Sequence, residues 1–373
     1  MNKRMIVLVG MLLISMLTVS FAGETNVGGH VKLTVFDRPT GEHNGESTSN
    51  YVGLTLNGLY LFINKEISEK VSVDLQPHWS ASTGATPSFG NDIAKKTPAG
   101  DIEPHFHGFV KAQVNVLLPN DFELGVGIVK PRFSWDYGAE LFWEDQINAS
   151  KFTANNYLGA VHDSGIELYR NFEIGDISLP TYVYLLNGGY QFGDNNNQPG
   201  FLATIEPEFG ALKFKASLSL GKYDEDAEKN YMKYLVGAAY DAGAFSARAE
   251  YAAGKWSESI VATKTDEGVP LTFKDATPMG YYAKIFYRFA DWGRVMLHYD
   301  YVDNNYSGFF YTALGSEKFT NIIPGLQLYV SGSSIIQVQY DIADWEQTEK
   351  FGIPGQKDTI KYNRLTVGWR TTF

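Results

Sequence analysis

Two cations flank a proline about a third of the way along the chain. Lys130 and Arg132 lie on either side of Pro131, directly after the alternating apolar stretch 122–128. Residues two apart point to the same face of a strand, so both side chains would be aimed at one side of a sheet. Lys and Arg side chains lower the energy of an anion inside a narrow pore. The pair therefore indicates a site that attracts anions.

Other basic residues occupy the polar face of similar alternating stretches, where they would face the interior of a closed sheet. With Lys130 and Arg132, the predicted lining and selectivity set consists of Lys111, Lys213, Lys215, Arg248, Lys284, Arg288 and Arg364. Lys32, Arg294 and Arg370 fall on the same faces, and the acids there are fewer: Asp74, Glu123, Glu167, Glu206, Glu208, Glu250, Asp300 and Asp341. This excess of bases predicts a modest anion preference. Alternatively, the cations pair with carboxylates on neighbouring strands and only brace the wall.

The strand period conflicts with the apolar pattern beside this pair. Ile128 lies two residues before Lys130 and would share its face. Proline cannot donate to a sheet ladder and is found at bulges and strand ends. We therefore expect the strand to be irregular near Pro131, so that at least one of the two cations reaches the interior.

Signs of catalytic chemistry are weak. The sequence has no cysteine and no Gly-x-Ser-x-Gly nucleophile elbow. His105 and His107 could share a metal on one strand face, but a polar strand face also tolerates histidine without a metal. Gly125 and Gly127 precede no helix and form no dinucleotide fingerprint. The sequence predicts no enzyme activity, no metal and no cofactor.

The elements that would position these residues are strands. In the last stretch, residues 360–373, Leu365, Val367, Trp369 and Phe373 form an apolar face opposite Arg364 and Arg370. A strand that alternates in this way has an apolar environment on one face and a polar environment on the other. Its edge must pair with another strand, because an unpaired edge would promote aggregation. Pairing with the first strand, residues 27–36, closes a barrel.

The rest of the chain repeats this pattern, with alternating strands separated by short turns and long polar loops in succession. We expect an all-β fold, a transmembrane antiparallel β-barrel of about 16 strands with short periplasmic turns and long extracellular loops. Aromatic residues near strand ends predict girdles at the membrane interfaces: Tyr60, Phe62, Trp79, Tyr234, Tyr240, Tyr287, Phe289 and Trp369.

The amino terminus resembles a secretory signal peptide. Lys3 and Arg4 precede an apolar run over residues 5–17, and small residues end at Ala22. Residues 1–22 are predicted to be removed, leaving one domain over residues 23–373. The formal charge of −11 becomes −13 without Lys3 and Arg4. Nucleic acid is therefore not an expected partner.

Two resemblances extend this interpretation. A final strand that ends in Phe373 is similar to that of bacterial outer-membrane β-barrels, which implies recognition by the barrel-assembly machinery, an outer-membrane location and contact with its lipid. Residues 127–135 (GIVKPRFSW), 162–169 (HDSGIELY) and 182–188 (YVYLLNG) together resemble the phosphate-selective porin O and P family. This chain departs from that family's pattern in having Arg132 between Pro131 and Phe133.

That family resemblance implies a homotrimer in which an extracellular loop, here residues 133–162, folds into each barrel. Trp135 and other aromatic residues of this loop could pack against the wall, while Asp136 and other charged residues would face water. The alternative is an ordinary packed external loop.

The predicted function is that of an outer-membrane porin, a water-filled channel for passive diffusion of small ions and hydrophilic solutes. One alternative is the barrel sheath of a porin–cytochrome electron conduit, in which a partner would carry the haem because this chain has no Cys-x-x-Cys-His. A less favoured alternative is an outer-membrane lipid hydrolase.

Overall fold

The computed structural model describes most of the chain after residue 24. The described residues are 25–43, 46–47, 52–83, 105–136, 163–187, 198–222, 228–261, 273–304, 316–331, 333–348 and 357–372. The predicted signal peptide, the aromatic terminus Phe373 and loop residues 137–162 lie outside them.

The described residues form strands almost throughout. Nineteen strand segments make one sheet: β1 (Thr25–His43), β2 (Glu46–Ser47), β3 (Val52–Ser68), β4 (Val71–Thr83), β5 (His105–Leu117), β6 (Glu123–Val129), β7 (Asp163–Ile174), β8 (Ile177–Leu186), β9 (Gly200–Ile205), β10 (Glu208–Phe209), β11 (Leu212–Lys222), β12 (Asn230–Ala242), β13 (Phe245–Val261), β14 (Phe273–Ala276), β15 (Met279–Ala290), β16 (Gly293–Asn304), β17 (Ser316–Ser331), β18 (Ser334–Thr348) and β19 (Lys357–Thr372). One 3₁₀ turn, η1 (Pro119–Asp121), joins β5 to β6. Within the described ranges, no helix is long and apolar enough to span a membrane.

These segments make up sixteen barrel strands. β9 and β10 both pair with β8 and β11, so they are one strand interrupted at residues 206–207. β14 and β15 both pair with β13 and are likewise one strand, interrupted at residues 277–278. β2 pairs with the end of β1 as a hairpin tip. The predicted strand number is confirmed.

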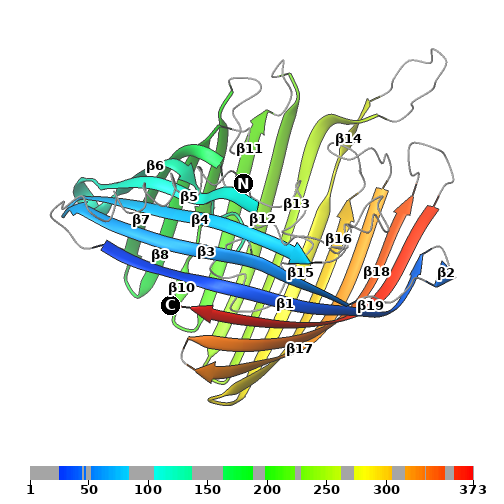
Figure 1. The fold of residues 1–373 in the computed structure, drawn as a ribbon. Helices are drawn as coiled ribbons and strands as arrows, with labels where there is room; N and C mark the ends of the chain where they lie inside the picture. Colours follow the sequence, from blue (N-terminus) through cyan, green and yellow to red (C-terminus); the bar gives the residue numbers. More distant parts are fainter. Residues whose placement is uncertain are drawn as a thin grey trace, which may run out of the picture.

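The sheet closes on itself (Figure 1). β1 pairs antiparallel with β3 on one side and with β19 on the other, from His30 opposite Thr372 to His43 opposite Ile360. The first and last strands therefore lie side by side, as the alternation in the last strand predicted. A closed barrel leaves no sheet edge unpaired.

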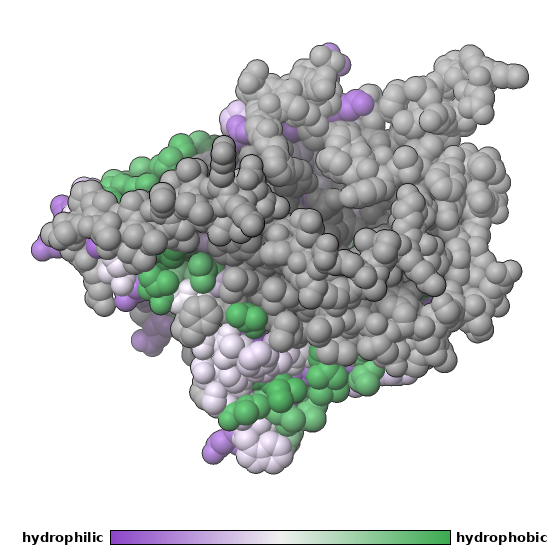
Figure 2. All heavy atoms as spheres, in the orientation of Figure 1, coloured by the Kyte–Doolittle hydropathy of each residue, from purple (hydrophilic) through white to green (hydrophobic). Residues whose placement is uncertain are grey.

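The wall has an apolar outer face and a polar inner face. On β19, Trp369 is 42% exposed whereas Thr366, on the other face, is 1% exposed. Apolar residues point outward on other strands as well, among them Val236, Ile285, Leu297 and Ile342. Figure 2 shows apolar side chains as green patches on the outer surface. An apolar outer surface on a closed barrel is typical of barrels that span a membrane.

Tight turns and long connections alternate around the barrel. Gly175 and Gly243 lie in tight turns with φ of 61° and 67°, a conformation that favours glycine. The tight turns join β3 to β4, β5 to β6, β7 to β8, β10 to β11, β12 to β13, β15 to β16 and β17 to β18. They occupy the same rim as the carboxyl end of β19, which makes that rim periplasmic.

The predicted aromatic girdle is correct for some residues and wrong for Tyr60. Tyr234, Tyr240, Tyr287, Phe289 and Trp369 are exposed on the outer face. Tyr60 is 8% exposed and stacks on His78 with ring centroids 4.1 Å apart. The β3–β4 register shifts between Leu56 and Leu59, which reverses the face on which later residues lie.

Candidate functional site

The candidate site begins where β6 ends. Val129 is the last residue of the strand and is buried on its inner side, while residues 130–136 leave the sheet. Pro131 is buried just after this point. The irregularity expected near Pro131 is thus a strand end, and the strand period no longer fixes the directions of Lys130 and Arg132.

Residues 130–136, here called the inward segment, run across the inner wall. The Arg132 amide donates to the Tyr184 hydroxyl on β8 at 3.3 Å, and Thr204 Oγ1 on β9 donates to the Arg132 carbonyl at 3.2 Å. Ser217 Oγ on β11 donates to the Phe133 carbonyl at 2.9 Å. These groups satisfy backbone atoms that the strand no longer pairs.

A buried carboxylate on β13 holds the middle of the inward segment. Ser134 Oγ donates to Glu250 Oε2 at 2.5 Å, and the Trp135 amide donates to Glu250 Oε1 at 2.9 Å. Both Glu250 and Ser134 are almost fully buried. Hydrogen bonds to an ionised carboxylate are about twice as strong as neutral ones, so this contact strongly fixes the segment.

An ion pair on β15 holds the end of the described segment. Lys284 Nζ donates to Asp136 Oδ1, and both side chains are almost completely buried. Asp136 was expected to face water, and this expectation is wrong. The chain turns inward so far that the carboxylate reaches a cation on a distant strand.

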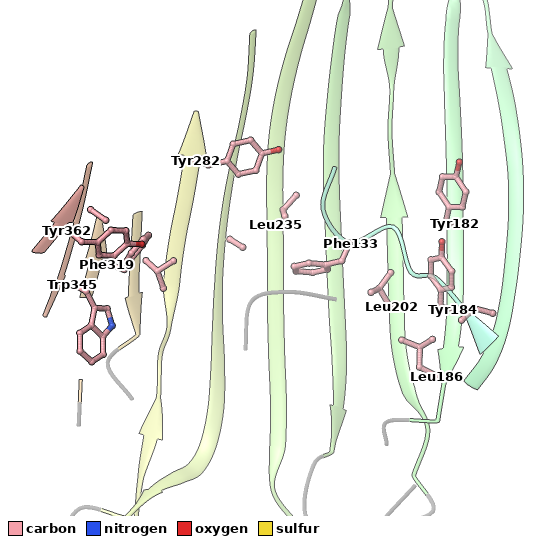
Figure 3. Packing of buried hydrophobic residues seen from close by; sticks show 14 residues of the cluster. Phe133, Tyr182, Tyr184, Leu186, Leu202, Leu235, Tyr282, Phe319, Trp345 and Tyr362 are labelled. Atoms are coloured by element: carbon pink, nitrogen blue, oxygen red, sulfur yellow. The ribbon is translucent and has the colours of Figure 1, made fainter. Parts of the chain in front are cut away.

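Aromatic and aliphatic side chains pack around Phe133 of the inward segment (Figure 3). Phe133 lies in a buried cluster with Leu202, Leu235 and Tyr184, which come from β9, β12 and β8. Lys233 Nζ lies 4.8 Å from the centre of the Phe133 ring. Trp135 is buried, as predicted, and the Lys215 and Arg248 cations lie 5.4 and 6.0 Å from its ring centre.

Gly237 on β12 makes room for the indole ring. A Cβ at this position would lie 3.0 Å from Trp135 Cζ3 and 2.9 Å from Glu250 Cγ. A glycine is therefore needed where the ring approaches the strand backbone.

At least five of the nine predicted lining cations form ion pairs with inward-facing carboxylates in the part of the chain that the structure describes. The pairs are Lys111–Asp74 at 2.9 Å, Lys213–Glu208 at 2.8 Å, Lys215–Glu206 at 2.9 Å, Lys284–Asp136, and Arg364–Asp341 at 3.2 Å. Lys215 and Lys284 are nearly fully buried, whereas Lys213 is half exposed. For these five cations the contacts favour the bracing interpretation.

The remaining four are placed differently. The guanidinium carbon of Arg132 lies 5.0 Å from the centre of the Tyr182 ring, and Arg132 is an exposed residue of the inward segment. Arg248 lies over Trp135, and Arg288 is exposed, 5.6 Å from the Tyr329 ring centre. Lys130 is half-buried. The inward segment itself therefore carries Lys130 and Arg132, and the wall brings Lys215, Arg248 and Lys284 to it. Lys111, Lys213, Arg288 and Arg364 lie elsewhere on the wall.

Amide side chains are a second feature of the interior. Asp74 accepts from Asn64 at 2.6 Å and Asn115 at 2.8 Å in addition to Lys111. Asp341 accepts from Asn321 at 3.0 Å and Gln339 at 3.4 Å in addition to Arg364. Each of these two carboxylates thus lies within a set of amide and cationic donors.

Sequence reasoning missed several residues that hold the inward segment. No feature of the sequence marked four of them as contacts of the inward segment: Tyr184, Thr204, Ser217 and Lys233. Each nevertheless occupies an inward position of its strand. The same two-residue alternation that located the cations could have identified them. Where the structure can be described, no group of three or more potential metal ligands comes together.

Comparisons with known proteins identify the fold. No protein-family model and no curated protein matches the chain. Similar solved structures include the in-vitro folded trimer form of the outer membrane protein OmpT of Vibrio cholerae. It is 14% identical in sequence, the match covers 94% of this chain and 100% of the OmpT chain, and the TM-score is 0.58. An anion-selective porin from Comamonas acidovorans is 13% identical with 94% and 100% coverage and TM-score 0.57. The outer membrane channel DcaP of Acinetobacter baumannii is 13% identical with 94% and 97% coverage and TM-score 0.57.

At these identities the likeness defines the fold, that of bacterial outer-membrane porins. Together with the apolar outer wall, this fold places the chain in the bacterial outer membrane.

Proposed function

We propose that the chain is a porin, a water-filled channel through which small ions and hydrophilic solutes diffuse passively across the outer membrane, with a modest anion preference. One observation carries this proposal: the inward segment is anchored on the inner wall of a closed barrel by side chains from β8, β9, β11, β13 and β15. A chain segment inside a barrel narrows its lumen. Residues 133–162 would form the constriction that begins with this segment.

The anion preference rests on the cations of the inward segment and of the wall beside it. Arg132 is exposed on the segment, and the wall contributes Lys215 and Lys284, which form ion pairs with Glu206 and Asp136. A paired cation adds little net field, so the preference should be small. Where water is excluded, one additional unit charge changes an ion's energy by about 1 kcal/mol or more.

The resemblance to the phosphate-selective porin O and P family and a homotrimeric assembly belong to the same proposal. Support for the trimer comes from the similar OmpT structure, which is described as a trimer form. Support for an anion preference comes from a similar structure described as an anion-selective porin.

Reversal potentials in planar bilayers test the selectivity. Wild-type protein in a salt gradient should give a small anion-selective potential, and Lys130→Glu/Arg132→Glu should shift it toward cations. The effect should be largest at low salt, where screening is weakest. Lys361→Glu is the matched control because Lys361 lies on the outward face and is 64% exposed. An unchanged reversal potential in the folded double variant would contradict a role for this pair in selectivity.

A further inference from the structure

The outer wall carries a groove near the rim of the long loops. It has a volume of about 590 Å³ and is lined by side chains of β9, β11, β12 and β13. Leu220 is directly opposite Phe201 on one side and Met232 on the other, and Met232 is opposite Lys255. One row across four strands is therefore apolar at three positions and cationic at the fourth.

The next row toward the loops is polar. Lys222 follows Leu220 on the same face of β11 and pairs with Asn230 of β12. The Asn230 amide donates to Ser257 Oγ at 2.8 Å. The groove thus has an apolar floor, with Lys255 at the β13 end of the apolar row and Lys222 one step nearer the loops.

The height of these residues is set by strand geometry. Outward apolar residues of β11 begin at Leu212, next to the periplasmic turn, and Lys222 lies ten residues further on. A strand rising about 3.3 Å per residue at a tilt of about 40° gains about 25 Å over that distance, the height of the apolar belt of such barrels. Lys222 therefore lies at the extracellular edge of the membrane, at the level of lipid head groups.

We propose that this groove binds a phosphate-bearing lipid of the outer leaflet. Its acyl chains would lie along Phe201, Leu220 and Met232, and its phosphate would contact Lys222 and Lys255. The two lysines stand two strands apart, about 10 Å laterally, a span that two extended lysine side chains can close onto a phosphate group. The groove places two cations beside an apolar floor, as such a lipid places its phosphate beside its acyl chains.

A carboxylate competes for Lys255. Lys255 forms an ion pair with Asp275 at 2.7 Å, and the two side chains are 56% and 41% exposed. An exposed pair of this kind is worth at most about 1 kcal/mol, so a phosphate can displace or share it. Lipid binding should accordingly weaken as salt rises.

The chain offers close controls on the same rim and the same face. Lys318 pairs with Asp303 at 3.6 Å and Lys361 with Asp344 at 3.5 Å, and both lysines are more than half exposed. Neither lysine lines the groove. They match Lys255 in charge, exposure and kind of partner, and differ in lying outside the groove.

Native mass spectrometry of the purified full-length barrel tests the proposal, with diphosphorylated lipid A as probe and its dephosphorylated form for comparison. Wild-type protein should retain the phosphorylated lipid, and Lys222→Gln/Lys255→Gln should lower its affinity at least about tenfold, while Lys318→Gln/Lys361→Gln should not. Heat-modifiable migration in gels confirms that each variant is folded. Equal retention by both double variants, or of both lipids by the wild type, would overturn the proposal. Competition by millimolar inorganic phosphate would also overturn it, by showing a simple anion site.

Discussion

At the scale of single residues, Glu250 links the inward segment to the wall. Its two carboxylate oxygens accept from Ser134 and from the Trp135 amide, so one side chain on β13 fixes two consecutive residues of the segment. The carboxylate is buried, and its loss leaves two donors without their acceptor. The position of the segment should therefore depend on this residue more than on the exposed acids.

Replacement of Glu250 by glutamine tests this dependence. Glu250→Gln keeps one acceptor oxygen but removes the charge, and should destabilise the folded barrel by about 1–3 kcal/mol. Trp135 should become more accessible to acrylamide, measured as the quenching difference between each protein and its Trp135→Phe counterpart. Glu208→Gln is the control, since Glu208 is one-third exposed and pairs with the half-exposed Lys213. Unchanged quenching of Trp135 would show that Glu250 does not hold the segment.

The Asp136–Lys284 pair makes a separate prediction. Lys284→Met leaves a buried carboxylate without its cation and should cost about 3–5 kcal/mol, because an unpaired buried charge is poorly solvated. Adding Asp136→Asn should recover most of that loss. Urea unfolding of the barrel in lipid vesicles measures both changes. If the double variant were as unstable as Lys284→Met, the two residues would not be coupled.

At the scale of elements, two-residue periodicity accounts for what the sequence could predict. The outward positions of Leu365, Val367 and Trp369 followed directly from alternation, because a strand between lipid and a polar interior must alternate. The same rule failed at Tyr60, where a register shift reverses the faces. A local irregularity of pairing is set by the neighbouring strands and leaves no signal in the period.

The inward segment shows a second limit of prediction. Burial of Trp135 could be predicted from its type, since a large aromatic ring gains most by leaving water. The partner of Asp136 could not be predicted, because Lys284 is 148 residues away in sequence. Whether two residues so far apart in sequence form an ion pair depends on how many strands lie between them and on the path of the inward segment.

Barrel closure gives a prediction for β1 and β19. Val35 and Val367 are directly opposite each other in the observed register. Cysteines at both positions should form a disulfide under mild oxidation and keep the barrel from unfolding when heated in SDS. Cysteines at Val35 and Tyr340 should not, because β19 separates β1 from β18. An absence of cross-linking at the first pair would contradict the closed register.

At the scale of the whole molecule, the alternation of turns and loops fixes the orientation. Glu228 lies at the end of a long connection and Asp291 in a tight turn, and both are exposed. A cysteine at Glu228 should react with an impermeant reagent on intact cells, whereas one at Asp291 should react only after the outer membrane is broken. Labelling in the opposite pattern would mean that the barrel is inserted the other way.

The interior of the barrel has two general features: many of its charges are neutralised by ion pairs, and the inward segment partly obstructs it. Most lining cations are paired, amides bridge the carboxylates, and the inward segment lies against one side of the wall. Such an interior should pass polar solutes according to size more than according to charge. The central claim is therefore passive, size-limited diffusion.

Swelling of liposomes that contain the purified barrel tests this claim most directly. Vesicles loaded with an impermeant polymer are diluted into isotonic solutions of neutral sugars of increasing size, and light scattering follows the entry of each solute. The account predicts rapid swelling with the smallest sugar and a rate that falls steeply with solute size. Swelling no faster than in protein-free vesicles, for any solute, would contradict the proposed channel.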